Sequence, residues 1–126
     1  MDIKKIKFDK SGLRSVLNPL ESDIMLFLWK SKRAKVRDIH SKLKKKHGVA
    51  LTSVAVTTDR LYKKGFVERK VGKGLGGLHY IYSPAKTKEQ LERSIIDNTV
   101  NKLIDIFGPN AVSYFNERFS RGKKNV

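Results

Sequence analysis

The chain has 126 residues, of which 39% are hydrophobic and 32% charged, and 28 Lys and Arg against 12 Asp and Glu give a formal net charge of +16. This composition is typical of one folded domain, or of a small domain with an appendage. It contains no Cys, which excludes disulfides, cysteine nucleophiles and thiolate metal sites. No apolar run approaches the roughly 18 residues that span a bilayer, and the N-terminus lacks the apolar core of a signal peptide, so we expect a cytoplasmic protein without membrane contact.

The positive charge is unevenly spread along the chain. Residues 1–84 carry 20 basic and 7 acidic side chains, whereas residues 85–126 carry 8 and 5. A field of this sign attracts polyanions such as nucleic acid. A lysine-rich surface that only keeps the protein soluble is the alternative, but the concentration of charge in the N-terminal part favours a polyanion-binding surface there.

The first predicted helix follows a basic arm. Residues 1–16 mix lysines with isolated apolar residues and show no sustained period. In NPLESDIMLFLWKSK, Asn18 is the expected N-cap, Pro19 occupies the first helical position and Glu21 completes a capping box. The apolar residues then recur at helical spacing, at Leu20, Ile24, Phe27 and Leu28.

Two further helices are predicted before the pattern changes. AKVRDIHSKLKKKHG places Val36, Ile39 and Leu43 on one face and ends at Gly48 after a basic last turn. The lysines of that turn, residues 44–46, either stabilise the helix end or reach a nucleic-acid backbone. TSVAVTTDRLYKKG predicts a third helix, capped by Thr52 or Ser53, although its β-branched residues lower helix propensity. The expected inward face is Val54, Thr57 or Thr58, and Leu61.

A β-hairpin is predicted after Gly65. FVERKV and LHYIYSP have strand character and are joined by a glycine-rich stretch. Gly72, Gly74 and Gly77 have the spacing G-x-G-x-x-G, which in dinucleotide-binding proteins leads from a strand into a helix. Here the glycines lead from strand to strand, so a hairpin loop is the better interpretation than a nucleotide site.

The C-terminal part is predicted to form two helices. TKEQLERSIIDNTVNKLIDIFG begins with a capping box at Thr87 and Gln90 and is broken by Gly108 and Pro109, and NAVSYFNERFS follows before a basic tail, residues 121–126. Their apolar surface is best buried against a second chain, with folding back onto the first domain as the alternative. The residues predicted to form this dimer contact are Ile96, Val100, Leu103, Phe107, Phe115 and Phe119.

The order of three helices and a hairpin predicts a winged helix-turn-helix, a mainly α fold with a small β-hairpin. The segments NPLESDIMLFLWKS, VRDI, TSVAVTTDRLYKKGFVERK and YIYSP resemble the penicillinase and methicillin-resistance repressor family over residues 17–84, and DRLYKKGFVERK is the most distinctive of them. The resemblance implies a homodimer, with a DNA-binding domain at 17–84 and a helical dimerisation region at 85–120, that binds a palindromic operator in double-stranded DNA.

By that resemblance the third helix lies in the major groove. Its candidates for base contact are Thr52, Ser53, Ala55, Val56 and Arg60. For Arg60 an intrahelical ion pair is the alternative. The candidates for phosphate contact at the helix end and on the wing are Lys63, Lys64, Lys73 and Gly74.

The sequence offers no residue set for catalysis, and the family's known switches are missing. It has no nucleophile elbow, metalloprotease motif or phosphate loop, and His40 and His47 lack further ligands at metal-site spacing. We therefore expect neither an enzyme nor a bound metal or cofactor. Penicillinase-type repressors are cleaved at an Asn-Phe bond and copper-responsive members use cysteines, and both are absent, so the effector stays unidentified. The alternative function is general binding of RNA or DNA without strong sequence preference.

Overall fold

The computed structural model describes residues 6–7, 10–74 and 76–124. Residues 1–5 and 8–9 of the predicted basic arm and residues 125–126 of the predicted tail lie outside this part of the chain. The chain divides into two compact units, Lys7–Glu92 and a second unit of Met1–Ile6 with Arg93–Val126. The first unit thus includes part of the predicted arm and the first residues of the predicted dimerisation region.

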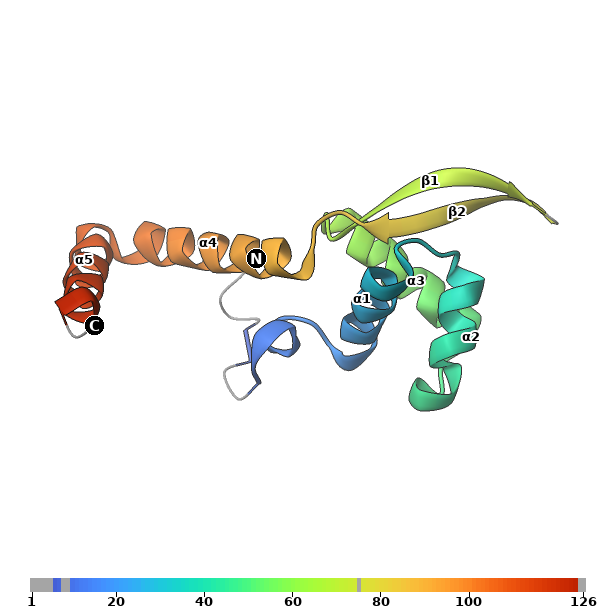
Figure 1. Ribbon diagram of the computed structural model, residues 1–126, viewed down its shortest axis with the longest axis horizontal. Coiled ribbons are helices and arrows are strands. Elements are labelled where there is room, and N and C mark those ends of the chain that lie inside the picture. The colour runs from blue at the N-terminus through green and yellow to red at the C-terminus, as the bar shows by residue number, and fades with distance from the viewer. Residues whose placement is uncertain (1–5, 8–9, 75, 125–126) are drawn as a thin grey trace. The chain divides into compact units, whose positions relative to one another are not determined.

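The order of elements confirms the predicted fold class (Figure 1). A short 3-10 helix, η2, precedes three helices, a hairpin and two C-terminal helices. Their bounds are η2 (Gly12–Ser15), α1 (Pro19–Ser31), α2 (Val36–His47), α3 (Leu51–Lys63), β1 (Val67–Gly74), β2 (Gly77–Pro84), α4 (Lys88–Phe107) and α5 (Pro109–Lys124). The helix α5 therefore continues through the first residues of the predicted basic tail.

The core of the first unit lies between α1, α2 and α3, which pack together at the base of the hairpin (Figure 1). Full burial of one Val, Leu, Ile or Met side chain stabilises the folded state by about 1.5–3 kcal/mol. Leu17 belongs to the same core, so the chain around η2 is anchored rather than extended. The fully buried apolar residues are Leu17, Ile24, Met25, Leu28, Ile39, Val54 and Leu61.

The helix starts follow the capping prediction in two cases and depart from it in a third. At α1, Asn18 Oδ1 accepts from the Glu21 amide at 2.8 Å and Glu21 Oε1 accepts from the Asn18 amide at 3.0 Å. Thr87 and Gln90 form the equivalent box before α4. The predicted cap of α3 at Thr52 or Ser53 is wrong, because the helix begins earlier, at Leu51, with Ala50 as an N-cap that has no side-chain bond.

The hairpin pairs β1 with β2 in antiparallel register from Val67 opposite Pro84 to Gly74 opposite Gly77. A further bridge, which the sequence did not indicate, joins Ala34 to Tyr82 through two backbone hydrogen bonds of 2.9 and 2.8 Å. The base of the hairpin is therefore attached to the segment between α1 and α2. From Tyr82 to the tip of the hairpin the sheet has only two strands.

A nearly buried carboxylate joins α1 to the end of α2. Asp23 Oδ2 lies 2.7 Å from His47 Nε2 and 2.8 Å from Lys46 Nζ, and the side chains of Asp23 and His47 are 13% and 12% exposed. Partial burial alone would raise the pKa of Asp23, but the hydrogen bonds from Lys46 and His47 together hold it below its ordinary value. The charged form of Asp23 therefore stabilises the packing of α1 on α2.

We expect Asp23→Asn to lower the free energy of unfolding at pH 7 by about 1.5–3 kcal/mol, because it removes charge-assisted hydrogen bonds. A depressed carboxyl pKa contributes stability above the unfolded value, about 3.9, and this contribution is lost as the pH falls through the folded value. The difference between wild type and variant should therefore shrink below about pH 4 in urea denaturation. Asp105→Asn, at an exposed position of α4, is the control, and equal effects of the two variants would contradict the assignment.

Candidate nucleic-acid interface

The helix α3 has one buried and one exposed face. Its buried residues are Val54, Thr57, Thr58 and Leu61, as predicted. The Thr57 and Thr58 hydroxyls donate to the carbonyls of the preceding turn at 2.8 and 2.7 Å, so these buried oxygens are satisfied within the helix. The opposite side of α3, which carries Thr52, Val56 and Arg60, is exposed.

Four of the five predicted base-contact residues lie on this exposed face. They are Thr52, Ser53, Val56 and Arg60, whereas Ala55 is half-buried. Val56, in the middle of the helix, is 57% exposed. Within the part of the chain that the structure describes, Arg60 has no ion-pair partner, so the alternative of an intrahelical pair is not formed there.

The predicted phosphate ligands differ in their surroundings. Lys64 Nζ lies 3.2 Å from Glu21 Oε2, and the Glu21 side chain is only 5% exposed. Lys63 is 73% exposed and pairs with Asp59 at 3.2 Å. Lys73 is exposed near the end of β1 and has no ion-pair partner among the described residues. Lys64 therefore has a structural contact that the sequence did not reveal, and Lys73 is the least engaged of the three.

The carboxylate of Asp59 connects α3 to the hairpin. Its two oxygens bind Lys63 Nζ at 3.2 Å, on the same helix, and Arg69 Nη1 at 2.8 Å, on β1. The hydrogen bonds from Lys63 and Arg69 lower the pKa of Asp59. An acidic residue beside the exposed face of α3 is thus neutralised by two cations of the chain itself.

Arg69 is the residue of this region that the sequence analysis missed. Its guanidinium carbon lies 3.9 Å from the ring centre of Tyr62 on α3 and 4.1 Å from that of Tyr80 on β2. Hydrogen bonding to Tyr82 raises the pKa of the guanidinium above its ordinary value. Arg69 stands opposite Tyr82, and next-but-one residues of a strand share a face, so strand alternation places Arg69 beside the tyrosines only once the hairpin register is known.

The glycines of the wing have two separate roles. Gly76 and Gly77, with φ of 92° and 102°, make the tight turn. Gly72 and Gly74 lie within β1 rather than in a loop, where an added Cβ would come within 2.7 Å of Ile81 Cδ1 and of His79 Cε1, respectively. The expectation of a glycine-rich loop is therefore wrong, because the strands continue up to the turn and the side chains across from β1 cover the two glycines.

Two of the three histidines, His40 and His47, have partners in the fold, whereas the buried Nε2 of His79 has no hydrogen-bond partner among the described residues. His40 Nε2 lies 3.0 Å from the carbonyl oxygen of Val49, and His47 contacts Asp23 as described above. No cluster of three or more His, Asp or Glu side chains that could hold a metal ion occurs in the described ranges.

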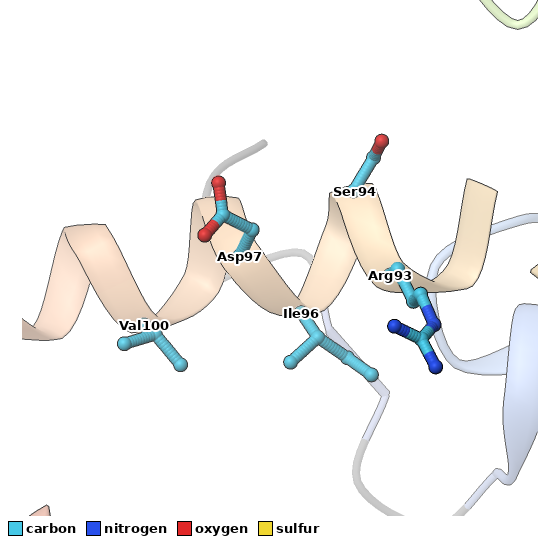
Figure 2. A pocket seen from close by; sticks show the side chains of 5 residues that line it. All are labelled: Arg93, Ser94, Ile96, Asp97 and Val100. Atoms are coloured by element: carbon cyan, nitrogen blue, oxygen red, sulfur yellow. The ribbon is translucent and has the colours of Figure 1, made fainter. Parts of the chain in front are cut away.

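The second unit has almost no interior. Over residues 93–121 only Ala111 is buried. Of the predicted dimer-contact residues, Ile96, Phe107 and Phe119 are 60–65% exposed, and Val100, Leu103 and Phe115 are half-buried. Figure 2 shows Ile96 and Val100 on one side of α4, with Ser94 and Asp97 on the other. Further exposed apolar residues that the prediction omitted are Ile106, Val112 and Tyr114.

Within the described residues, none of the helices combines the length and the apolar character that crossing a membrane requires.

Comparison with known proteins gives a family and a fold. The penicillinase repressor family matches the chain over residues 17–124, and no protein with a curated description matches it. A possible transcriptional regulator of Methanosarcina mazei Go1 superposes with a TM-score of 0.58 at 21% identity, over 78% of this chain and 79% of that chain. A transcriptional regulator of Thermotoga maritima gives a TM-score of 0.49 at 20% identity, over 90% and 82%. FabT of Streptococcus pneumoniae in complex with DNA gives 0.48 at 16% identity, over 97% and 83%.

The two neighbouring lysines at the end of α3 should respond differently to substitution. We expect Lys64→Gln to lower the free energy of unfolding by about 1–3 kcal/mol, because it leaves the buried carboxylate of Glu21 without its cation. Lys63→Gln should change it by less than about 0.5 kcal/mol, since the pair that it breaks is exposed. Urea denaturation of both variants checks this, and equal losses would refute a structural role for Lys64.

Proposed function

The chain belongs to the penicillinase repressor family and is a winged-helix transcriptional regulator, and we propose that it acts as a homodimer that represses transcription by binding a palindromic operator. The members of this family are DNA-binding regulators rather than enzymes. Bound at a promoter, such a dimer would occlude the DNA from transcription.

The observation that carries this proposal is the division of α3 into a packed face and a free face. The free face presents two hydroxyls, Thr52 and Ser53, which can bond bases or phosphates, and the Val56 side chain, which fits a thymine methyl group. Arg60 adds a guanidinium that has no ion-pair partner in the described part of the chain, and this is the group that most often contacts guanine. These are the groups that a recognition helix needs in the major groove.

The wing would bind the backbone beside the groove. Lys73 supports this role, because it is exposed and has no ion-pair partner in the described part of the chain. Gly74, its neighbour, stays a candidate for a backbone contact, although the ring of His79 lies where a Cβ of this residue would be. Lys63 and Lys64 remain candidates, but a phosphate would have to compete there with Asp59 and Glu21. Such contacts fix the register of the protein on DNA without reading sequence.

Dimerisation is supported by the second unit. Two helices that bury one residue over 93–121 cannot be stabilised by their own core, and their exposed aromatic residues need a partner surface. A second copy of the chain supplies it, and in a symmetric dimer the same residues would meet on both sides. Two α3 helices would then bind half-sites about 34–36 Å apart.

Selection of genomic DNA fragments by the purified protein tests the proposal. We expect recovery of a shared inverted repeat that the protein protects in the presence of excess nonspecific DNA. Binding without any shared sequence at moderate salt would favour general nucleic-acid binding and overturn the operator proposal.

Arg60→Ala should weaken binding to the recovered operator by about 1–3 kcal/mol, because the arginine would contact a base edge. Fluorescence anisotropy with operator and with scrambled DNA measures the change for both ligands. Arg118→Ala, which removes the same charge from an exposed position of α5, is the matched control. An operator affinity unchanged by Arg60→Ala would exclude Arg60 from recognition.

Combining Phe107→Ser with Phe119→Ser should raise the dimer dissociation constant at least about tenfold, because buried aromatic residues dominate interface energies. Sedimentation equilibrium over a range of protein concentrations measures it. Val71→Ser, at a 59% exposed position of β1, is the control for loss of exposed apolar surface. A wild-type chain that stays monomeric at all concentrations would refute the dimer.

A further inference from the structure

The guanidinium of Arg69, on β1, is enclosed by groups from two other elements, α3 and β2. Tyr62 of α3 and Tyr80 of β2 place their ring centres 3.9 and 4.1 Å from its central carbon. Its edge donates to Asp59 of α3 at 2.8 Å. The planar cation thus has two rings in stacking range and a carboxylate at its edge, an arrangement that a lysine cannot reproduce.

This cluster lies level with the last backbone pairing, among the described residues, between the hairpin and another part of the first unit. The bridge from Ala34 holds β2 at Tyr82, directly opposite Arg69 in the register. Beyond that pair the wing is a two-stranded ribbon, a structure that is marginally stable by itself in water. The contacts of Arg69 with α3 therefore hold the ribbon at the position where it starts to project.

The same face of β1 carries Lys73 four residues further on. Arg69, Val71 and Lys73 alternate with residues of the opposite face, and they stand opposite Tyr82, Tyr80 and Leu78. At about 3.3 Å per residue, Lys73 lies about 13 Å along the strand from Arg69. A small rotation of the strand at Arg69 thus moves Lys73 by a much larger distance than it moves the guanidinium itself.

Direct contact of Arg69 with DNA is disfavoured by its surroundings. The side chain is 21% exposed and is paired with Asp59, so a phosphate would have to displace the carboxylate and enter between two rings. Arg60 and Lys73, by contrast, are exposed and unpaired in the described residues.

We infer that the stacked guanidinium of Arg69 is a positioning element, which fixes the wing on the recognition helix so that Lys73 meets the DNA backbone while α3 is in the groove. The inference rests on the proposed function. In this view Arg69 sets the distance between the two DNA contacts of one winged helix, α3 in the groove and Lys73 on the backbone. Neither α3 nor the wing determines this distance alone.

A double-mutant cycle on the full-length chain tests the inference through DNA affinity. Lys73→Gln should weaken operator binding and lower the log-log salt slope by about 1.8, because each protomer of the dimer loses one phosphate contact. In the Arg69→Gln background the fold-loss from Lys73→Gln should be smaller by at least about twofold. The control cycle replaces Arg69→Gln by Lys70→Gln, which removes the same charge from the neighbouring residue on the other face of β1, and there the two effects should multiply. Multiplying effects in the Arg69 cycle would overturn the inference.

Hydrogen exchange without DNA gives a second, independent measurement. Arg69→Gln should speed amide exchange in β1 and β2 while α1 and α2 keep their protection. Arg69→Lys should exchange as fast as Arg69→Gln in the hairpin. Exchange at the wild-type rate in Arg69→Lys would show that a positive charge is enough, and would refute the role of the planar guanidinium. If Arg69→Gln does not fold, Tyr80→Leu takes its place, because it removes one ring and keeps the ion pair. Failure to recover any operator would refute the proposed function, whereas the exchange result would still decide the positioning role.

Discussion

The organisation of the winged helix depends on one buried carboxylate, that of Glu21. Burial of a charge is costly unless hydrogen bonds and an opposite charge compensate it. Glu21 has both, since one oxygen accepts from the Asn18 amide at the start of α1 and the other binds Lys64 just after α3. The same side chain therefore begins one helix and fixes the end of another. Because α3 is held in this way, its free face has a defined direction.

The other joints of the first unit follow the same plan. Asp23 joins α1 to α2, and Asp59 joins α3 to β1, each with two cationic or potentially cationic partners. The chain has 28 basic and 12 acidic residues. A few of its carboxylates thus join neighbouring elements by pairing with basic side chains of the same chain. Most other basic side chains of the described residues are exposed, where they add to the field that attracts a polyanion. Basic residues that pair with carboxylates thus stabilise the fold, whereas exposed basic residues at other positions favour DNA binding.

Features that depend on local sequence could be predicted, and features that depend on long-range contacts could not. The box at Asn18 and Glu21 was readable because its residues are three apart, and the inward face of α3 followed from helical periodicity. The start of α3 was misjudged because the two hydroxyl residues suggested a cap, whereas Ala50 begins the helix without one. The bridge at Ala34 is a single residue without any period, and the Arg69 cluster requires the hairpin register together with the position of α3. The roles of the exposed residues toward DNA stay predictions.

The two covered glycines of β1 have a consequence for the history of the wing. The space beside Gly74 is occupied by the ring of His79, and that beside Gly72 by Ile81. An added Cβ at either glycine would meet the end of the covering side chain at 2.7 Å, so that side chain would have to shift to make room. In a diverging lineage we therefore expect the glycines and the residues that cover them to vary together. Glycines whose spacing resembles a ligand-binding signature thus leave room, in this wing, for the side chains of the opposite strand.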